Sequence, residues 1–134
     1  MIFKLLSGRT EVFMSDKNML SIPYCQYSME MRSGKIIEID YGFTSLLGYT
    51  QDDVNNGLVF KQMVPDVEYK AIIDELREQF IENRYVCYQH EMLTKSGETL
   101  EVVSFIRIQN KLLDGHRVLK VSVANISDYM GQKC

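Results

Sequence analysis

The sequence predicts an α+β domain, because segments of alternating residues stand on both sides of a group of helical segments. Two alternating segments come first, several short helical segments and one long one follow, and three alternating segments close the chain. Strands grouped in this way are typical of an antiparallel sheet that carries its helices on one face. We therefore expect five antiparallel strands, with the short helices and the long helix packed on one face of the sheet.

The length of 134 residues suits one domain with one core. We expect an N-terminal extension over residues 1–22, the domain itself over 23–130, and the start of a C-terminal linker over 131–134. The apolar spacing in LLSGRTEVFM makes the extension a candidate helix.

The first alternating segment, YCQYSMEM, places Cys25, Tyr27, Met29 and Met31 on one face of a half-buried strand. RSGK then offers a glycine for a tight turn, and KIIEID forms the returning strand. Residues 24–40 are therefore predicted to form a hairpin.

Short helices follow the hairpin and are separated by glycines. Asp40 can cap the first helix, and Gly48 can end it in the left-handed conformation. Thr50 begins the next helix, and Asp53 three residues later approximates a capping box. A further helical turn is predicted in VFKQMV.

A longer helix is predicted over PDVEYKAIIDELREQFIENR, which begins at Pro65. Its apolar side chains recur at helical spacing and must face an apolar surface. They are Tyr69, Ile72, Ile73, Leu76 and Phe80.

Three strands are predicted to supply that surface: YVCYQHEMLT, TLEVVSFIRIQ and RVLKVSVANI. The first two are joined by the turn KSGE. Asp114-Gly115 is a strong hairpin signal between the last two.

The composition excludes several classes of protein. The net charge of −3, with no basic patch, argues against nucleic-acid binding. No apolar run reaches the ~20 residues that span a bilayer, so we expect no membrane contact from this segment and a cytoplasmic location. The three cysteines are widely spaced, which favours reduced thiols over disulfides or a zinc site.

Catalysis is not expected in this chain, because GxSxG, HExxH and P-loop motifs are absent. Cys87 and His90 are three residues apart on one predicted strand. Their side chains therefore point to opposite faces and cannot form a nucleophile–base pair. Any enzymatic activity would reside in a fused or partner effector.

Four motifs resemble those of the PAS family, also called sensory-box domains. GKIIEIDYGFTSLLGYTQDDV is similar to the family's opening strand and short helix, and MVPDVE to its His-Pro-Glu-Asp segment. TKSGETLEV is similar to its Lys-x-Gly turn, and NISDY to its closing Asp-Ile-Thr-Glu motif. The chain departs from the pattern at Val64 in place of histidine, Asp40 in place of asparagine and Asn125 in place of aspartate. The order and spacing of the motifs are typical of a PAS fold.

This resemblance implies the input module of a bacterial signalling protein. Such a domain binds a small molecule, mediates dimerisation, or does both, and regulates a fused or partner effector of the diguanylate cyclase or histidine kinase type. The alternatives are a ligand-free homodimerisation or protein-interaction module, and a stand-alone regulator that acts by partner binding. In many members the closing motif helps to link the sheet to the effector, which assigns signal coupling to Asn125, Ile126, Ser127 and Asp128.

A ligand pocket is predicted between the long helix and the sheet, from the apolar faces of these elements and from the family's pattern. His90, Ser104 and Tyr88 are its candidate polar groups; alternatively, His90 is a core histidine and Ser104 a packing residue. The predicted pocket residues are Tyr69, Ile72, Ile73, Leu76, Tyr88, His90, Met92, Val102, Ser104, Ile106, Val121 and Val123.

The resemblance also bears on cofactors, whose identity stays unknown. In haem-binding PAS domains the axial histidine lies on the long helix, and residues 66–84 contain no histidine. Light-sensing LOV-type flavin domains need a reactive cysteine ahead of that helix, and no cysteine lies between Cys25 and Cys87. Haem and LOV-type flavin are therefore not expected.

The opposite face of the sheet carries Leu93, Val103 and Phe105 among polar residues. Apolar side chains on an outer sheet face are expected to be shielded from solvent by another segment or chain. A helix from residues 1–22 or a second copy of the chain would shield them, and we expect a homodimer.

Overall fold

The computed structural model describes residues 22–130, and the structural statements below concern that part of the chain. The predicted linker, and the predicted extension up to Ser21, lie outside it.

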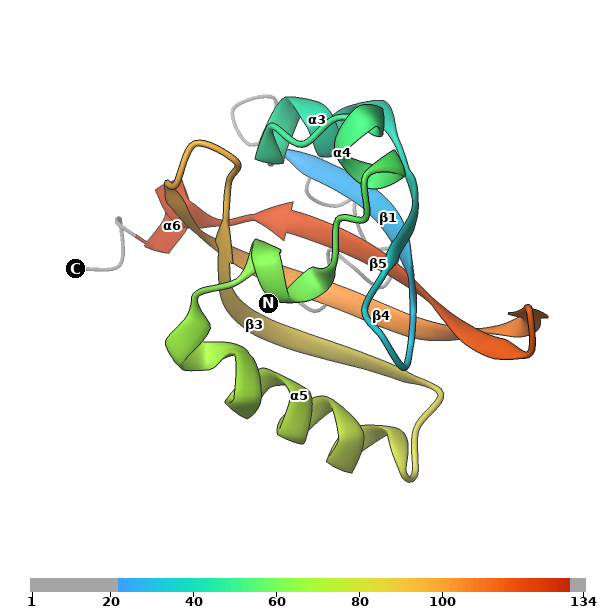
Figure 1. Ribbon diagram of the computed structural model, residues 1–134. Coiled ribbons are helices and arrows are strands. Elements are labelled where there is room, and N and C mark those ends of the chain that lie inside the picture. Colours follow the sequence, from blue (N-terminus) through green and yellow to red (C-terminus); the bar gives the residue numbers. More distant parts are fainter. Residues whose placement is uncertain (1–21, 131–134) are drawn as a thin grey trace, which may run out of the picture.

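A five-stranded antiparallel sheet forms one layer of the fold, in the order β2-β1-β5-β4-β3 (Figure 1). The strands are β1 (Tyr24–Glu30), β2 (Ile36–Ile39), β3 (Tyr85–Leu93), β4 (Thr99–Leu113) and β5 (His116–Asn125). The helices are α3 (Tyr41–Leu47), α4 (Gln51–Asn55), the 3₁₀ turn η2 (Phe60–Met63), α5 (Asp66–Phe80) and α6 (Ser127–Met130). The α+β class and the hairpin over residues 24–40 are thus confirmed.

The helices from α3 to α5 pack on one face of the sheet. Figure 1 shows α5 running beside β3, with α3 and α4 grouped near β1. One core joins both groups, because Phe43 of α3, Ile72 of α5 and Val121 of β5 belong to the same buried cluster. Burial of that cluster is the main force that holds the helices on the sheet.

The caps predicted for the short helices are present. Asp40 accepts a hydrogen bond at Oδ1 from the Phe43 backbone N–H (2.9 Å), and Gly48 has a φ of 87° at the end of α3. Thr50 and Asp53 form a reciprocal capping box on α4. The sequence therefore fixes both ends of α3 and the start of α4 through local hydrogen bonds.

Two features near Asp40 were not predicted. Its second carboxylate oxygen accepts a hydrogen bond from the Gln26 backbone N–H of β1 (3.0 Å), so one side chain ties α3 to the sheet. Gly42 allows the same close approach, because a Cβ there would lie 2.8 Å from the carbonyl oxygen of Tyr24.

Three predicted boundaries are wrong. The long helix ends at Phe80 rather than near Arg84, because the Arg84 carbonyl already accepts a sheet-type bond from the Ile108 N–H (3.0 Å). β4 continues to Leu113, past a shift in register that breaks its alternation. Met31 lies beyond the end of β1 and is exposed.

Within residues 22–130, no helix combines the length and apolar content needed to cross a membrane.

Candidate functional site

A cavity of about 470 Å³ lies between α5, the β1–β2 hairpin and the tip of the β4–β5 hairpin. Phe60 and Tyr69 contribute aromatic rings whose centroids are 6.4 Å apart. The backbone N–H of Met31 donates to the carbonyl oxygen of Arg117 (2.9 Å), which holds the two hairpins together beside the cavity. The lining residues are Met29, Met31, Arg32, Gly34, Phe60, Tyr69, Ile73, Leu76, Arg77, Phe80, Gly115, His116, Arg117 and Leu119.

The cavity contains part of the predicted pocket set. Tyr69, Ile73 and Leu76 of α5 line it. The other predicted residues lie on the helix and on the sheet face beneath it, where most of them are buried in the core: Ile72, Tyr88, His90, Met92, Val102, Ser104, Ile106, Val121 and Val123. The other lining residues were not predicted, and among them are four basic residues from segments far apart in the chain: Arg32, Arg77, His116 and Arg117.

The predicted polar groups of the pocket satisfy one another. His90 Nδ1 lies 2.9 Å from the Glu91 carbonyl oxygen, which can only accept, so Nδ1 carries the proton. Nε2 then accepts a hydrogen bond from the Ser104 hydroxyl at 2.8 Å. The Tyr88 ring stacks on the imidazole with centroids 5.7 Å apart. This geometry agrees with the alternative reading of His90 as a satisfied core histidine.

Burial lowers the pKa of His90 from its ordinary value of 6.5, against the opposing effects of its hydrogen bond to the Glu91 carbonyl and of the Glu101 charge. Below pH 6.5 the unfolded chain therefore takes up a proton that the folded chain does not. We expect the free energy of unfolding to fall as the pH falls from about 7 to about 5.5. Urea titrations at several pH values measure this.

The variant that isolates this pH effect is His90→Gln. It should lose less stability on acidification than the wild type does, because the buried imidazole is absent from it. Equal slopes in the wild type and His90→Gln would contradict the assignment.

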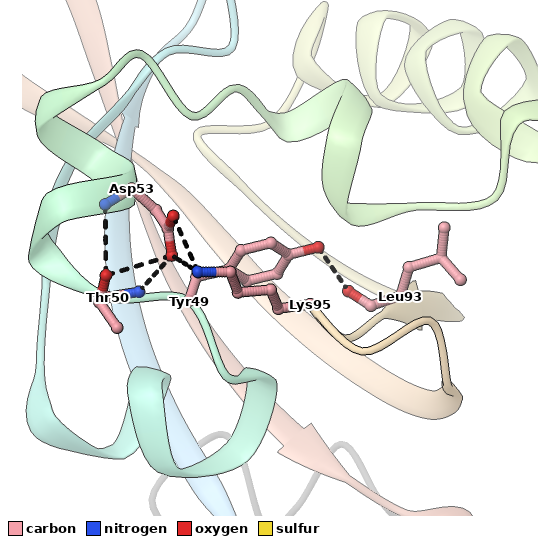
Figure 2. Close-up of polar contacts among 5 residues, drawn as sticks. All are labelled: Tyr49, Thr50, Asp53, Leu93 and Lys95. Carbon is pink, nitrogen blue, oxygen red and sulfur yellow. Dashed lines mark hydrogen bonds and ion pairs between the residues drawn. The ribbon is translucent and has the colours of Figure 1, made fainter.

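A polar clamp joins the start of α4 to the β3–β4 turn (Figure 2). Asp53 accepts hydrogen bonds from the Thr50 N–H (2.8 Å) and from Lys95 Nζ (3.0 Å and 3.1 Å). Tyr49 Oη donates to the Leu93 carbonyl oxygen, 3.1 Å away. These contacts fix the short helices to the far end of the sheet, away from the cavity lining.

Tyr49→Phe should lower the free energy of unfolding by about 1 kcal/mol, because Tyr49 is buried and its hydroxyl has carbonyl partners. Tyr41→Phe makes the same chemical change on a residue that is 90% exposed and should have little effect. Urea denaturation of both variants measures the difference. Equal stability of the two variants would count against a stabilising role for the clamp.

The residues assigned to signal coupling close the sheet. Asn125 Oδ1 accepts a hydrogen bond from the Ser127 N–H (3.0 Å), and Ser127 Oγ accepts one from the Glu101 N–H (2.9 Å). The Ile126 N–H donates to the Glu101 carbonyl (2.8 Å), and Asp128 is exposed in the first turn of α6. Asparagine at position 125 therefore accepts a backbone hydrogen bond here.

The two cysteines in the described part of the chain are free thiols with raised pKa values. Burial, and secondarily the Asp40 charge, raises the pKa of Cys25 to about 12, and burial raises that of Cys87 to about 11. Both groups are therefore protonated at neutral pH, which disfavours thiolate chemistry. Residues 22–130 contain no group of three or more histidine, cysteine or acidic side chains placed to hold a metal ion.

Comparisons with known proteins relate the fold to solved structures. No family model and no curated protein sequence matches the chain. The PAS domain of a protein from Colwellia psychrerythraea matches with a TM-score of 0.70 and 15% identity, covering 92% of this chain and 98% of that one. A sensory box histidine kinase/response regulator from Burkholderia thailandensis matches with a TM-score of 0.63 and 10% identity, covering 94% and 90%.

A third solved structure is Drosophila melanogaster Cycle PAS-B with bound ethylene glycol. It matches with a TM-score of 0.58 and 16% identity, covering 74% of this chain and 98% of that one. At these identities the likeness concerns the fold. The strand order, the group of short helices and the single long helix are consistent with these matches. This chain therefore has the PAS fold.

Proposed function

We propose that this domain is a sensory module that binds a small organic molecule in the cavity between α5 and the two hairpins. The observation that carries the proposal is the cavity itself. Its volume of about 470 Å³ and its largely apolar lining agree with the usual size and character of small-ligand sites. The solved Cycle PAS-B, whose structure contains ethylene glycol, gives an example of the fold with a bound small molecule.

The position of the cavity supports a signalling role. Met29 of β1 and Leu119 of β5 both line it, and they are direct partners in the sheet. β5 leads straight to Asn125 and the segment assigned to signal coupling. A ligand that changes the packing of Leu119 would therefore act on a strand that continues toward the effector.

The effector in this proposal is a fused or partner enzyme, and the domain has a regulatory role only. Structures from sensor histidine kinases among the similar folds favour that type. A diguanylate cyclase is the other effector that we propose, and the cytoplasm is the proposed location.

A native mass spectrum of the gently purified protein, beside its denatured mass and an absorbance scan, tests ligand binding. We expect a bound mass that is lost on denaturation. Ile73→Trp places an indole into the cavity and should remove the bound mass. Ile81→Trp makes the same change at a position that is 78% exposed and should retain it. A bound mass that persists in Ile73→Trp would place the ligand elsewhere.

The second candidate function is homodimerisation without a ligand. Tyr85 is 61% exposed and packs on Phe105, with ring centroids 5.6 Å apart, on the sheet face opposite the helices. An aromatic pair with one exposed and one half-buried ring suits a protein interface. Analytical ultracentrifugation should then show a dimer that Phe105→Glu weakens. A monomer at tens of micromolar would contradict this candidate, whereas an apo dimer in the native spectrum would favour it.

A further inference from the structure

The ionisable side chains that line the cavity belong to basic residues and one tyrosine. Arg32, Arg77, His116 and Arg117 line it together with Tyr69, and no aspartate or glutamate does. The chain as a whole carries a net charge of −3, so this local excess of basic groups runs against the overall composition. A cavity lined by one sign of charge concentrates ligands of the opposite sign.

These basic residues converge from three separate elements. Arg32 stands in the turn after β1, Arg77 in the last turn of α5, and Arg117 near the start of β5. The hydrogen bond between the Met31 N–H and the Arg117 carbonyl holds the first and third of these segments side by side. We call Arg32, Arg77, His116 and Arg117 the basic rim of the cavity. The tertiary fold brings these residues together, and no run of charged residues in the sequence does so.

The three arginines form no ion pair with another residue of the 22–130 segment, where the ion pairs are Lys70–Asp74 and Lys95–Asp53. The nearby carboxylates have other partners. Glu30 accepts a hydrogen bond from Ser33, which lowers its pKa, with a smaller contribution from His116. Asp74 pairs with Lys70, and the nearby Arg77 charge makes a further, smaller contribution to its lowered pKa. A ligand would therefore not have to displace an ion-pair partner from any of the three guanidinium groups.

We propose that the ligand of this cavity is an organic anion with an apolar body, and specifically a carboxylate. The proposal rests on the sensory function above and names its ligand class. A guanidinium binds a carboxylate through two parallel hydrogen bonds, which gives both affinity and orientation. The apolar part of the ligand packs against Phe60, Ile73 and Leu119, and the carboxylate meets Arg77 and Arg117 at the rim.

Isothermal titration calorimetry with three probes of equal chain length tests this class: octanoate, octanol and octylamine. Octanoate should bind about tenfold or more tightly than octanol, because hydrogen bonds to charged groups are the stronger ones. Octylamine should bind most weakly. Added salt should weaken octanoate binding and leave octanol binding nearly unchanged.

The double variant Arg77→Gln, Arg117→Gln should lose about tenfold in octanoate affinity and keep its affinity for octanol. Both positions are exposed, so the variant should fold. The control is Arg107→Gln, which removes one arginine from an exposed position outside the cavity and should bind octanoate as the wild type does.

Equal affinity for octanoate and octanol would overturn the anion proposal and leave the sensory function standing. The anion proposal would also be overturned if Arg107→Gln lost as much octanoate affinity as the double variant. The loss of affinity would then follow from the change in net charge and not from the cavity arginines. Binding of none of the probes overturns the proposed ligand class, whereas the sensory function is judged separately by the bound mass in the native spectrum.

Discussion

Ser104→Trp is expected to lower the free energy of unfolding by more than about 3 kcal/mol. Ser104 is 1% exposed, and its hydroxyl donates to His90 Nε2. An indole at this position would overpack the core between β4 and the helices, and it would leave the buried imidazole nitrogen without a partner. Urea denaturation at neutral pH measures the loss.

Arg107→Trp is the matched control, because it places the same side chain on the same strand at an exposed position. It should change the stability by no more than about 0.5 kcal/mol. A wild-type stability of Ser104→Trp would mean that the space around Ser104 is open, and the ligand site would then extend from the rim to the sheet floor.

Phe43→Ala is expected to cost about 3–5 kcal/mol. Phe43 is fully buried at the point where α3 meets the sheet. Its ring meets Tyr27 edge-on with centroids 5.3 Å apart and lies 6.2 Å from the ring of Tyr49. Removing the ring leaves a void between Tyr27 and Tyr49. Chemical denaturation should therefore show a large drop in the free energy of unfolding.

Ser45→Ala, on the exposed side of the same helix, controls for changes in α3 itself and should be close to neutral. If Phe43→Ala costs no more than Ser45→Ala, α3 contributes little to the core and the short helices are held by their polar contacts alone.

The sequence predicts best those features that depend on near neighbours. The caps at Asp40 and Thr50 and the glycine stop at Gly48 need only residues within one or two turns, and all are present. Strand alternation similarly places His90 with Tyr88 on one face of its strand and Ser104 with Val102 on one face of the next, and the register Tyr88–Ser104 and His90–Val102 agrees with both. A pattern of local spacing contains this information.

The features missed by the sequence analysis depend on segments that are distant in the chain. The β4 register shift lies between Ile108 and Leu112. The pairing with β5 is irregular there, so the sequence does not show a regular alternation of apolar and polar residues. The rim of the cavity joins Arg32, Arg77 and Arg117, and no local pattern relates three single arginines on a turn, a helix and a strand. Their convergence requires the strand order, in which β1 and β5 are neighbours.

The pairing of β1 with β5 determines how the sheet responds to a pull on the chain. Tyr24 pairs with Ala124, and the Asn125 N–H donates to the Pro23 carbonyl (2.9 Å), so the chain enters and leaves the central pair of strands at one end. A force that pulls Tyr24 and Asn125 apart acts on the last hydrogen bonds between β1 and β5, and not on all the bonds between these strands at once. The antiparallel pair should then peel open bond by bond from Tyr24, at a low force. The Met29–Leu119 pair lies toward the opposite end of this ladder, so it should open only after the pairs nearer Tyr24 have separated.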